Sequence, residues 1–133
     1  MLPRLALAGF LLAHAAVHLG YVSRRPPATG GPTWPFELGR SWLLTPLGVD
    51  PGLARAVGTA LTLATIVAFV VAALAAAGLV AGAWLPAIVA GTAASVVLLI
   101  VFFHPWLLLG VAIDVALLWV ALGQGWTPAQ LPA

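Results

Sequence analysis

Long apolar stretches alternate with short polar ones along this chain, and the alternation predicts four helices. A helix rises about 1.5 Å per residue, so about 20 apolar residues cross a hydrocarbon layer of about 30 Å. Segments over about 5–21, 51–77, 83–103 and 106–122 meet this requirement. The pattern therefore predicts an all-α fold, a bundle of four transmembrane helices that forms a single domain over 1–133.

Two short interruptions define how consecutive helices are joined. Gly78 to Gly82 connects the second segment to the third, and Pro105 separates the third from the fourth. A helix continuing through Pro105 would be about 60 Å long, twice the hydrocarbon thickness, so we expect the chain to reverse there. Asp50 and Pro51 precede the second segment, as a capping acceptor and a first-turn proline do. We expect Asp50 to cap that helix.

The first loop, 22–50, is the one substantial stretch outside the four segments. Its first part, from Arg24 to Pro32, is rich in proline and glycine and resists regular structure. The part that follows carries several aromatic and apolar side chains, with Glu37 and Arg40 one turn apart, which suits the headgroup boundary. We expect a short interfacial helix over about 35–44.

Composition predicts that the solvent of this bundle is a lipid bilayer. The chain is 63% hydrophobic and 6% charged, and its mean hydropathy is +1.15. Soluble domains are about a quarter charged, so these few charges do not cover a water-exposed surface. The absence of cysteine excludes disulfides and thiolate metal sites. The five arginines are scattered, which gives no support for binding nucleic acid.

The arginines are distributed unevenly between the two ends of the bundle. Arg4 and the amino terminus lie at one end of the bundle. Four arginines lie at the opposite end, which holds the first loop, namely Arg24, Arg25, Arg40 and Arg55. The positive-inside rule then predicts a cytoplasmic first loop and both termini outside. The alternative for the first segment is a cleavable signal peptide, because Arg4 precedes an apolar run and Ala13-His14-Ala15. The apolar stretch continues to Tyr21, which favours a span.

Small residues recur at every fourth position in the second and third segments. The first series is Ala60, Ala64, Ala68, Ala72 and Ala76, and the second is Ala83, Ala87, Gly91 and Ser95. In lipid, such small side chains let two helices approach closely. We expect these two segments to pack as neighbours, although so alanine-rich a chain also produces such series by chance.

Ionisable side chains within the spans are few, and they are the candidates for chemistry. His14 and His18 lie one turn apart on the first helix, and Asp114 is the sole acid within a span. From the loop end, His14 lies about 11 Å deep and Asp114 about 12 Å, so we expect them to meet. His104 lies at the boundary, which suggests a polar ladder leading to Asp114. An ionisable residue at such depth is by default a functional candidate.

Several interpretations of this cluster remain open at the level of sequence. The first is a latch between helices, a hydrogen bond that contributes about 0.6 and at most about 2 kcal/mol. The functional alternatives are a proton relay, a binding site for a quinone-like or lipid head group, and ligation of a metal or haem. Metal and haem have the least support, because thiolates and an H-E-x-x-H pattern are absent. We therefore predict no metal site, and no cofactor is established.

The aromatic side chains predict membrane boundaries and a contact surface. Tryptophan gathers at membrane interfaces. The candidate contact residues around the first loop are Trp34, Phe36, Glu37, Arg40, Trp42 and Trp106. The leading hypothesis is a structural or accessory subunit, with the lipid bilayer and other membrane subunits or further copies of the chain as partners. The alternative is a proton or small-molecule site on His14, His18 and Asp114. Catalysis has little support, because no serine has the surroundings of an activated nucleophile.

Three strings carry a resemblance to known proteins. They are Trp34-Pro35-Phe36-Glu37-Leu38 with Arg40-Ser41-Trp42-Leu43-Leu44, His104-Pro105-Trp106-Leu107 through Ile113-Asp114, and His14-x-x-x-His18. The chain resembles small four-helix integral membrane proteins of bacteria that have no assigned activity, and its opening from Arg4 to His14 is faintly similar to DoxX-like proteins. The resemblance implies a four-helix architecture and a bacterial plasma membrane location.

Overall fold

The computed structural model describes residues 1–23 and 34–131, and within them the chain forms helices and turns. Four helices dominate, and they are α1 over Leu2–Val17, α2 over Pro51–Ala76, α3 over Trp84–Val101 and α4 over Leu108–Leu118. Further helical turns extend them at His18–Tyr21, Ala81–Ala83, Pro105–Leu107 and Trp119–Gly123. With these turns, each of the four is long and apolar enough to cross a membrane, which confirms the predicted fold class.

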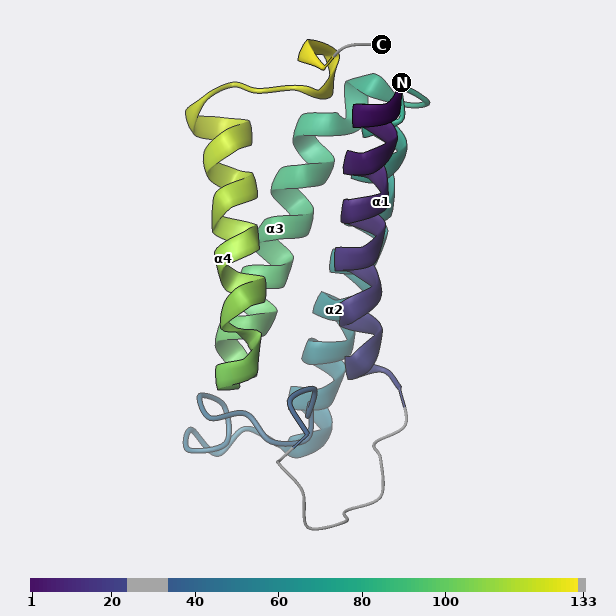
Figure 1. Ribbon diagram of the computed structural model, residues 1–133. Coiled ribbons are helices and arrows are strands. Elements are labelled where there is room, and N and C mark those ends of the chain that lie inside the picture. The colour runs from purple at the N-terminus through teal and green to yellow at the C-terminus, as the bar shows by residue number, and fades with distance from the viewer. Residues whose placement is uncertain (24–33, 132–133) are drawn as a thin grey trace.

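The helices run alternately up and down, so the bundle has two distinct ends (Figure 1). The first residues of the chain, its last described residues and the turn between α2 and α3 lie at one end, which we call the terminal end. The described part of the first loop and the turn between α3 and α4 lie at the other, which we call the loop end. Arg24 and Arg25, which enter the orientation argument, lie outside the described residues.

The helix ends follow from local sequence chemistry. The Asp50 Oδ1 atom accepts a hydrogen bond from the Leu53 amide at 3.0 Å, which confirms the predicted cap. After α2, Gly78 adopts a φ of +90°, a left-handed conformation that favours glycine. The amides of Gly78 and Leu79 then bond back to the carbonyls of Ala75 and Leu74, the pattern of a Schellman cap. The predicted break at Pro105 is confirmed, since a new helical turn begins there.

The predicted pairing of α2 with α3 is confirmed, since these helices form the most extensive contact in the bundle. A Cβ atom built on Gly91 would lie 3.3 Å from the Ala68 Cβ, so the two backbones approach closely at this point. The predicted alanine series, however, is buried only in its second half, and Ala60 and Ala64 are exposed. A step of four residues turns about 40° too far on each repeat of a 3.6-residue helix, so the series leaves the interface.

Two apolar clusters form the core, one towards each end of the bundle. Leu11, Phe69 and Ile88 belong to the cluster at the terminal end, and Leu98 and Phe102 belong to the cluster at the loop end. Between these clusters along the helices lie buried polar side chains, which are His14, His18, Thr62, Thr65, Thr92, Ser95 and Asp114. The fold therefore collects most of its buried polar groups into one layer across α1 to α4.

The helix expected over about 35–44 is wrong, because this segment forms a series of turns. Its side chains capture backbone amides that a helix would need. The Ser41 Oγ atom accepts from the amides of Leu43 and Leu44, and the Glu37 Oε1 atom accepts from the Gly39 amide. Short polar side chains compete with a helix in this way. These local hydrogen bonds therefore favour turns over the helix that was expected for this apolar segment.

The turns of the first loop are fixed beneath the end of α3. The Ser41 hydroxyl donates to the Val101 carbonyl at 2.5 Å, and the Trp42 indole donates to the Ile100 carbonyl at 2.6 Å. These carbonyls belong to the last turn of α3, where intrahelical partners run out. The loop thereby satisfies the helix end and is held in place over the base of the bundle.

Candidate functional site: a cavity between α1 and α4

The buried polar layer contains a direct link between α1 and α4. The His14 Nε2 atom lies 2.9 Å from the Asp114 Oδ1 atom, as the depth count predicts. Asp114 is fully buried and His14 nearly so. A hydrogen bond or ion pair at this place offsets the cost of burying either group alone. The Phe69 ring meets the His14 ring edge to face at 4.9 Å and supports its orientation.

His18 extends this link to α3. Its Nδ1 atom lies 3.1 Å from the His14 carbonyl oxygen, and its Nε2 atom lies 2.9 Å from the Ser95 Oγ atom. A carbonyl oxygen only accepts, so the His18 Nδ1 atom carries the proton of this bond. In the neutral ring the Nε2 atom is then an acceptor, and the Ser95 hydroxyl donates to it. Both nitrogens of His18 are thus engaged, and His18 holds the layer together.

Two polar atoms of the layer, the Asp114 Oδ2 and Thr65 Oγ1 atoms, are buried and have no hydrogen-bond partner within the described part of the chain. Buried polar groups are ordinarily paired, so such exceptions call for an explanation. In the His14 ring the Nε2 atom faces Asp114, which leaves the Nδ1 atom as the nitrogen that the link does not use.

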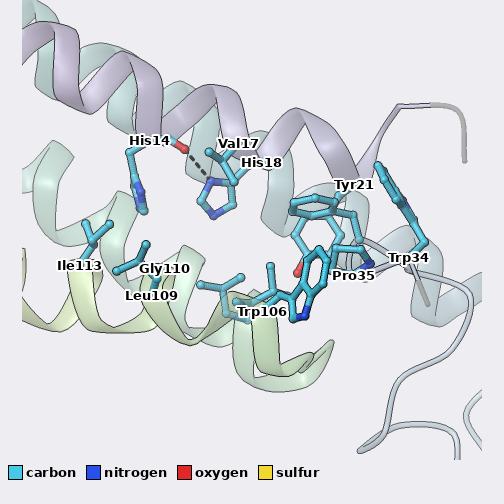
Figure 2. A pocket seen from close by; sticks show the side chains of 13 residues that line it. His14, Val17, His18, Tyr21, Trp34, Pro35, Trp106, Leu109, Gly110 and Ile113 are labelled. Atoms are coloured by element: carbon cyan, nitrogen blue, oxygen red, sulfur yellow. Dashed lines mark hydrogen bonds between the residues drawn. The ribbon is translucent and has the colours of Figure 1, made fainter. Parts of the chain in front are cut away.

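A cavity of ≈ 450 Å³ lies beside His14, between α1, the start of α4 and the first loop. Figure 2 shows His14, Val17 and His18 on the α1 side, with Leu109, Gly110 and Ile113 of α4 facing them. Trp34 and Pro35 of the loop lie at one end. The complete lining is His14, Val17, His18, Tyr21, Trp34, Pro35, Phe36, Leu99, Trp106, Leu107, Leu109, Gly110 and Ile113. Most of these side chains are apolar or aromatic.

Tyr21 provides an unpaired polar group at the loop end of the cavity. Its side chain is buried, and its ring meets the Phe36 ring edge to face at 5.1 Å. Among the described residues its hydroxyl has no hydrogen-bond partner. A buried tyrosine hydroxyl usually finds a partner. A molecule that brings an oxygen acceptor into the cavity would supply one.

The protonation of the His14–Asp114 pair decides what the His14 ring can offer to the cavity. When Asp114 is ionised and His14 is neutral, the His14 Nε2–H donates to the carboxylate, which leaves the Nδ1 atom as an acceptor. One added proton makes His14 an imidazolium, or makes Asp114 an acid that donates to the Nε2 atom. In either case the Nδ1 atom carries a hydrogen and becomes a donor.

The predicted site residues are only partly brought together. His14, His18 and Asp114 form one network, whereas His104 caps the turn before α4, where its Nδ1 atom accepts from the Trp106 amide at 3.3 Å. His104 lines a different hollow, beside Glu37 and Arg40. His104 is therefore not part of the network of His14, His18 and Asp114, although the predicted polar ladder included it. Within the described residues, no group of three or more potential ligands is placed to hold a metal ion.

The predicted contact residues around the first loop also have different surroundings. Trp34 and Phe36 line the cavity, and Phe36 packs against Tyr21. Trp42 and Trp106 are exposed to the outside of the bundle, although Trp106 also borders the cavity. Only part of this set therefore remains for contact with another protein.

Sequence reasoning missed one member of the site. Ser95 was grouped with the small residues of its helix, and its burial opposite His18 depends on how α1 packs against α3. Tyr21 follows His14 and His18 at a spacing of seven and three residues, which predicts that all three share one face of the first helix that looks into the bundle. All three are buried, which confirms that face.

Comparison with known protein families, curated proteins and solved structures finds no match to this chain. The resemblance to small four-helix membrane proteins of bacteria stays a prediction. Function is therefore inferred from the geometry of the site.

Proposed function

We propose that this chain is an integral protein of the bacterial plasma membrane, and that its α1–α4 cavity binds a small amphipathic molecule with a quinone-like head group. The observation that carries the proposal is a largely apolar cavity with two polar side chains in its lining, Tyr21, whose buried hydroxyl has no partner among the described residues, and His14, whose Nδ1 atom is not used by the bond to Asp114. The proposed ligand has a planar ring that bears oxygen atoms.

The size and lining of the cavity support a ring-shaped ligand. A volume of ≈ 450 Å³ lies within the usual range of about 300 to 1,000 Å³ for small-molecule sites. Tyr21, Trp34, Phe36 and Trp106 provide aromatic surfaces against which a planar ring packs well. Among the described residues the lining includes no arginine and no lysine, which favours a neutral head group over a phosphate.

The polar positions support a ring that carries carbonyl or hydroxyl oxygens. A carbonyl accepts from the Tyr21 hydroxyl, and a hydroxyl donates to the His14 Nδ1 atom in the less protonated state of the His14–Asp114 pair. With an additional proton on the pair, the same nitrogen donates to a carbonyl. A ring whose oxygens change between carbonyl and hydroxyl therefore finds a suitable hydrogen-bond partner at His14 in either protonation state of the pair.

Membrane location and orientation belong to the same proposal. Four apolar helices support a bilayer location, and the first loop then faces the cytoplasm because arginines gather at that end. The cavity lies near the loop end, so the head group of a bound ligand would lie close to the cytoplasmic boundary. The accessory-subunit hypothesis stays a prediction, and Trp42 is a candidate for such a contact because it is exposed and does not line the cavity.

A binding measurement with matched variants tests the proposed site. The full chain is placed in lipid nanodiscs, and binding of a benzoquinone with a methyl tail is followed by quenching of tryptophan fluorescence. We expect Tyr21→Phe to weaken binding about two- to tenfold, the effect of one hydrogen bond. Ile113→Trp fills the cavity and should abolish binding, whereas Val115→Trp is the control, because Val115 is exposed on the same helix and does not line the cavity. Equal binding by wild type and Ile113→Trp contradicts the proposal.

A further inference from the structure

A second hollow lies along the same seam between α1 and α4, towards the terminal end of the bundle. Its volume is ≈ 300 Å³, and its lining includes Leu7 and Phe10 of α1 together with Ala116 and Leu117 of α4. Trp84 and Trp126 border its far end. Apart from the two indoles, these side chains have no polar group. The hollow is thus an apolar surface open at the side of the bundle.

The second hollow adjoins the cavity along both helices. Ile113 lines both spaces, so they are neighbours on either side of this side chain. On α1 the lining residues recur at helical spacing from Leu7 through His14 to Tyr21, which places them on one face. That face extends over about 21 Å at 1.5 Å per residue. The two spaces therefore follow one seam, which is apolar at one end and has polar side chains at the other.

The His14–Asp114 link lies where the two spaces meet. The Phe10 ring stacks on the His14 ring with centroids 6.3 Å apart, so His14 is flanked by the second hollow on one side and by the cavity on the other. The link holds α1 and α4 together while leaving the seam open on both sides of it. A molecule lying in the seam would thus pass over His14.

We infer that the ligand of this site carries a single long apolar chain, which lies in the second hollow against Phe10, Ala116 and Leu117 while its head group occupies the cavity. This inference rests on the proposed function and adds the class of ligand, an oxygen-bearing ring with a prenyl or alkyl tail. Two observations favour one chain with a neutral head over a diacyl phospholipid. The two spaces follow one seam, and within the part of the chain that the structure describes neither is lined by arginine or lysine.

The experiment compares two tails on one head group and two tryptophan substitutions on one helix. The full chain in nanodiscs is titrated with a benzoquinone that carries either a methyl tail or a multi-prenyl tail, each at a matched mole fraction in the lipid. Ala116→Trp fills the second hollow, and Ala112→Trp is its control, because Ala112 is exposed on α4 and lines neither space. Binding is read as the rise in midpoint temperature of unfolding.

The expected result is tighter binding of the long-tailed quinone by about threefold or more, because its tail packs against fixed side chains of the second hollow more closely than against fluid lipid chains. Ala116→Trp should remove this advantage and leave the methyl-tailed quinone unaffected, and Ala112→Trp should change neither. If the two quinones bind equally well and Ala116→Trp changes neither affinity, the inference of an apolar tail in the second hollow is overturned. The proposed head-group site is then unaffected. If neither quinone binds, or if only phospholipid is retained and quinone does not displace it, the inference and the proposed function both fail.

Discussion

The His14 Nε2 atom and the Asp114 Oδ1 atom lie 2.9 Å apart and join the first helix to the last across 100 residues of sequence. Both side chains are buried, and one carboxylate oxygen remains unpaired within the described part of the chain. A link of this kind stabilises the arrangement of α1 and α4, and it also sets the hydrogen-bonding character of the cavity beside it. The predictions below separate these two contributions.

Asp114→Asn tests how much the link contributes to stability. Asparagine replaces the carboxylate by a neutral amide, which removes the charge and weakens the bond to His14. We expect the free energy of unfolding to fall by about 0.6 to 2 kcal/mol, the range of hydrogen bonds within membranes. The measurement is thermal or denaturant unfolding of the full chain in detergent. Asp50→Asn is the matched control, because Asn caps a helix as well as Asp does and should leave stability nearly unchanged. Equal losses in both variants would contradict a specific role for Asp114.

Ser95 and His18 are expected to be energetically coupled. The Ser95 hydroxyl bonds to the His18 Nε2 atom at 2.9 Å, and both side chains are buried. Ser95→Ala leaves that nitrogen unpaired, whereas in a His18→Leu background the same substitution removes nothing further. A double-mutant cycle of unfolding free energies should therefore give a coupling of about 1 kcal/mol. Additive effects of the two substitutions would argue against the bond.

Gly58 and Gly9 should respond in opposite directions to substitution by alanine. A Cβ atom at Gly58 would lie 2.6 Å from the Leu38 Cδ2 atom and 2.9 Å from the Phe102 ring, so overpacking should lower stability by about 1 kcal/mol or more. At Gly9 the added Cβ meets nothing within 4 Å, and helix propensity should raise stability by up to about 1 kcal/mol. Unfolding in detergent gives both values. A stabilised Gly58→Ala variant would contradict the packing of the loop against α2.

The proposed orientation is testable with single cysteines, because the chain contains none. Leu47 is exposed at the loop end, and Gln124 is exposed after the last span. We expect a membrane-impermeant maleimide added to intact bacterial cells to label Gln124→Cys and to spare Leu47→Cys until the membrane is opened. The reverse pattern would place the first loop outside. Labelling of both in intact cells would contradict a membrane-spanning bundle.

The four helices were predictable from sequence because span length and apolar composition are local properties of each segment. The pairing of His14 with Asp114 was also predictable, since counting residues from one membrane boundary gave them equal depth. The prediction of an interfacial helix was wrong because the Ser41 and Glu37 side chains accept hydrogen bonds from neighbouring amides. The apolar and aromatic residues of this segment do not reveal that local competition. The cavity was not predictable, because it depends on how α1, α4 and the loop around Trp34 pack together.

Photolabelling tests the central claim, that the α1–α4 cavity binds a quinone-like ring, most directly. The full chain in nanodiscs is irradiated with an azido-benzoquinone, and the modified positions are mapped by mass spectrometry, with excess unlabelled quinone as competitor. The account predicts competable labelling at the cavity lining, centred on Tyr21, Trp106 and Ile113, and its loss in Ile113→Trp but not in Val115→Trp. Labelling spread over exposed side chains such as Leu63 and Val67 of α2, and insensitive to competitor, would contradict it.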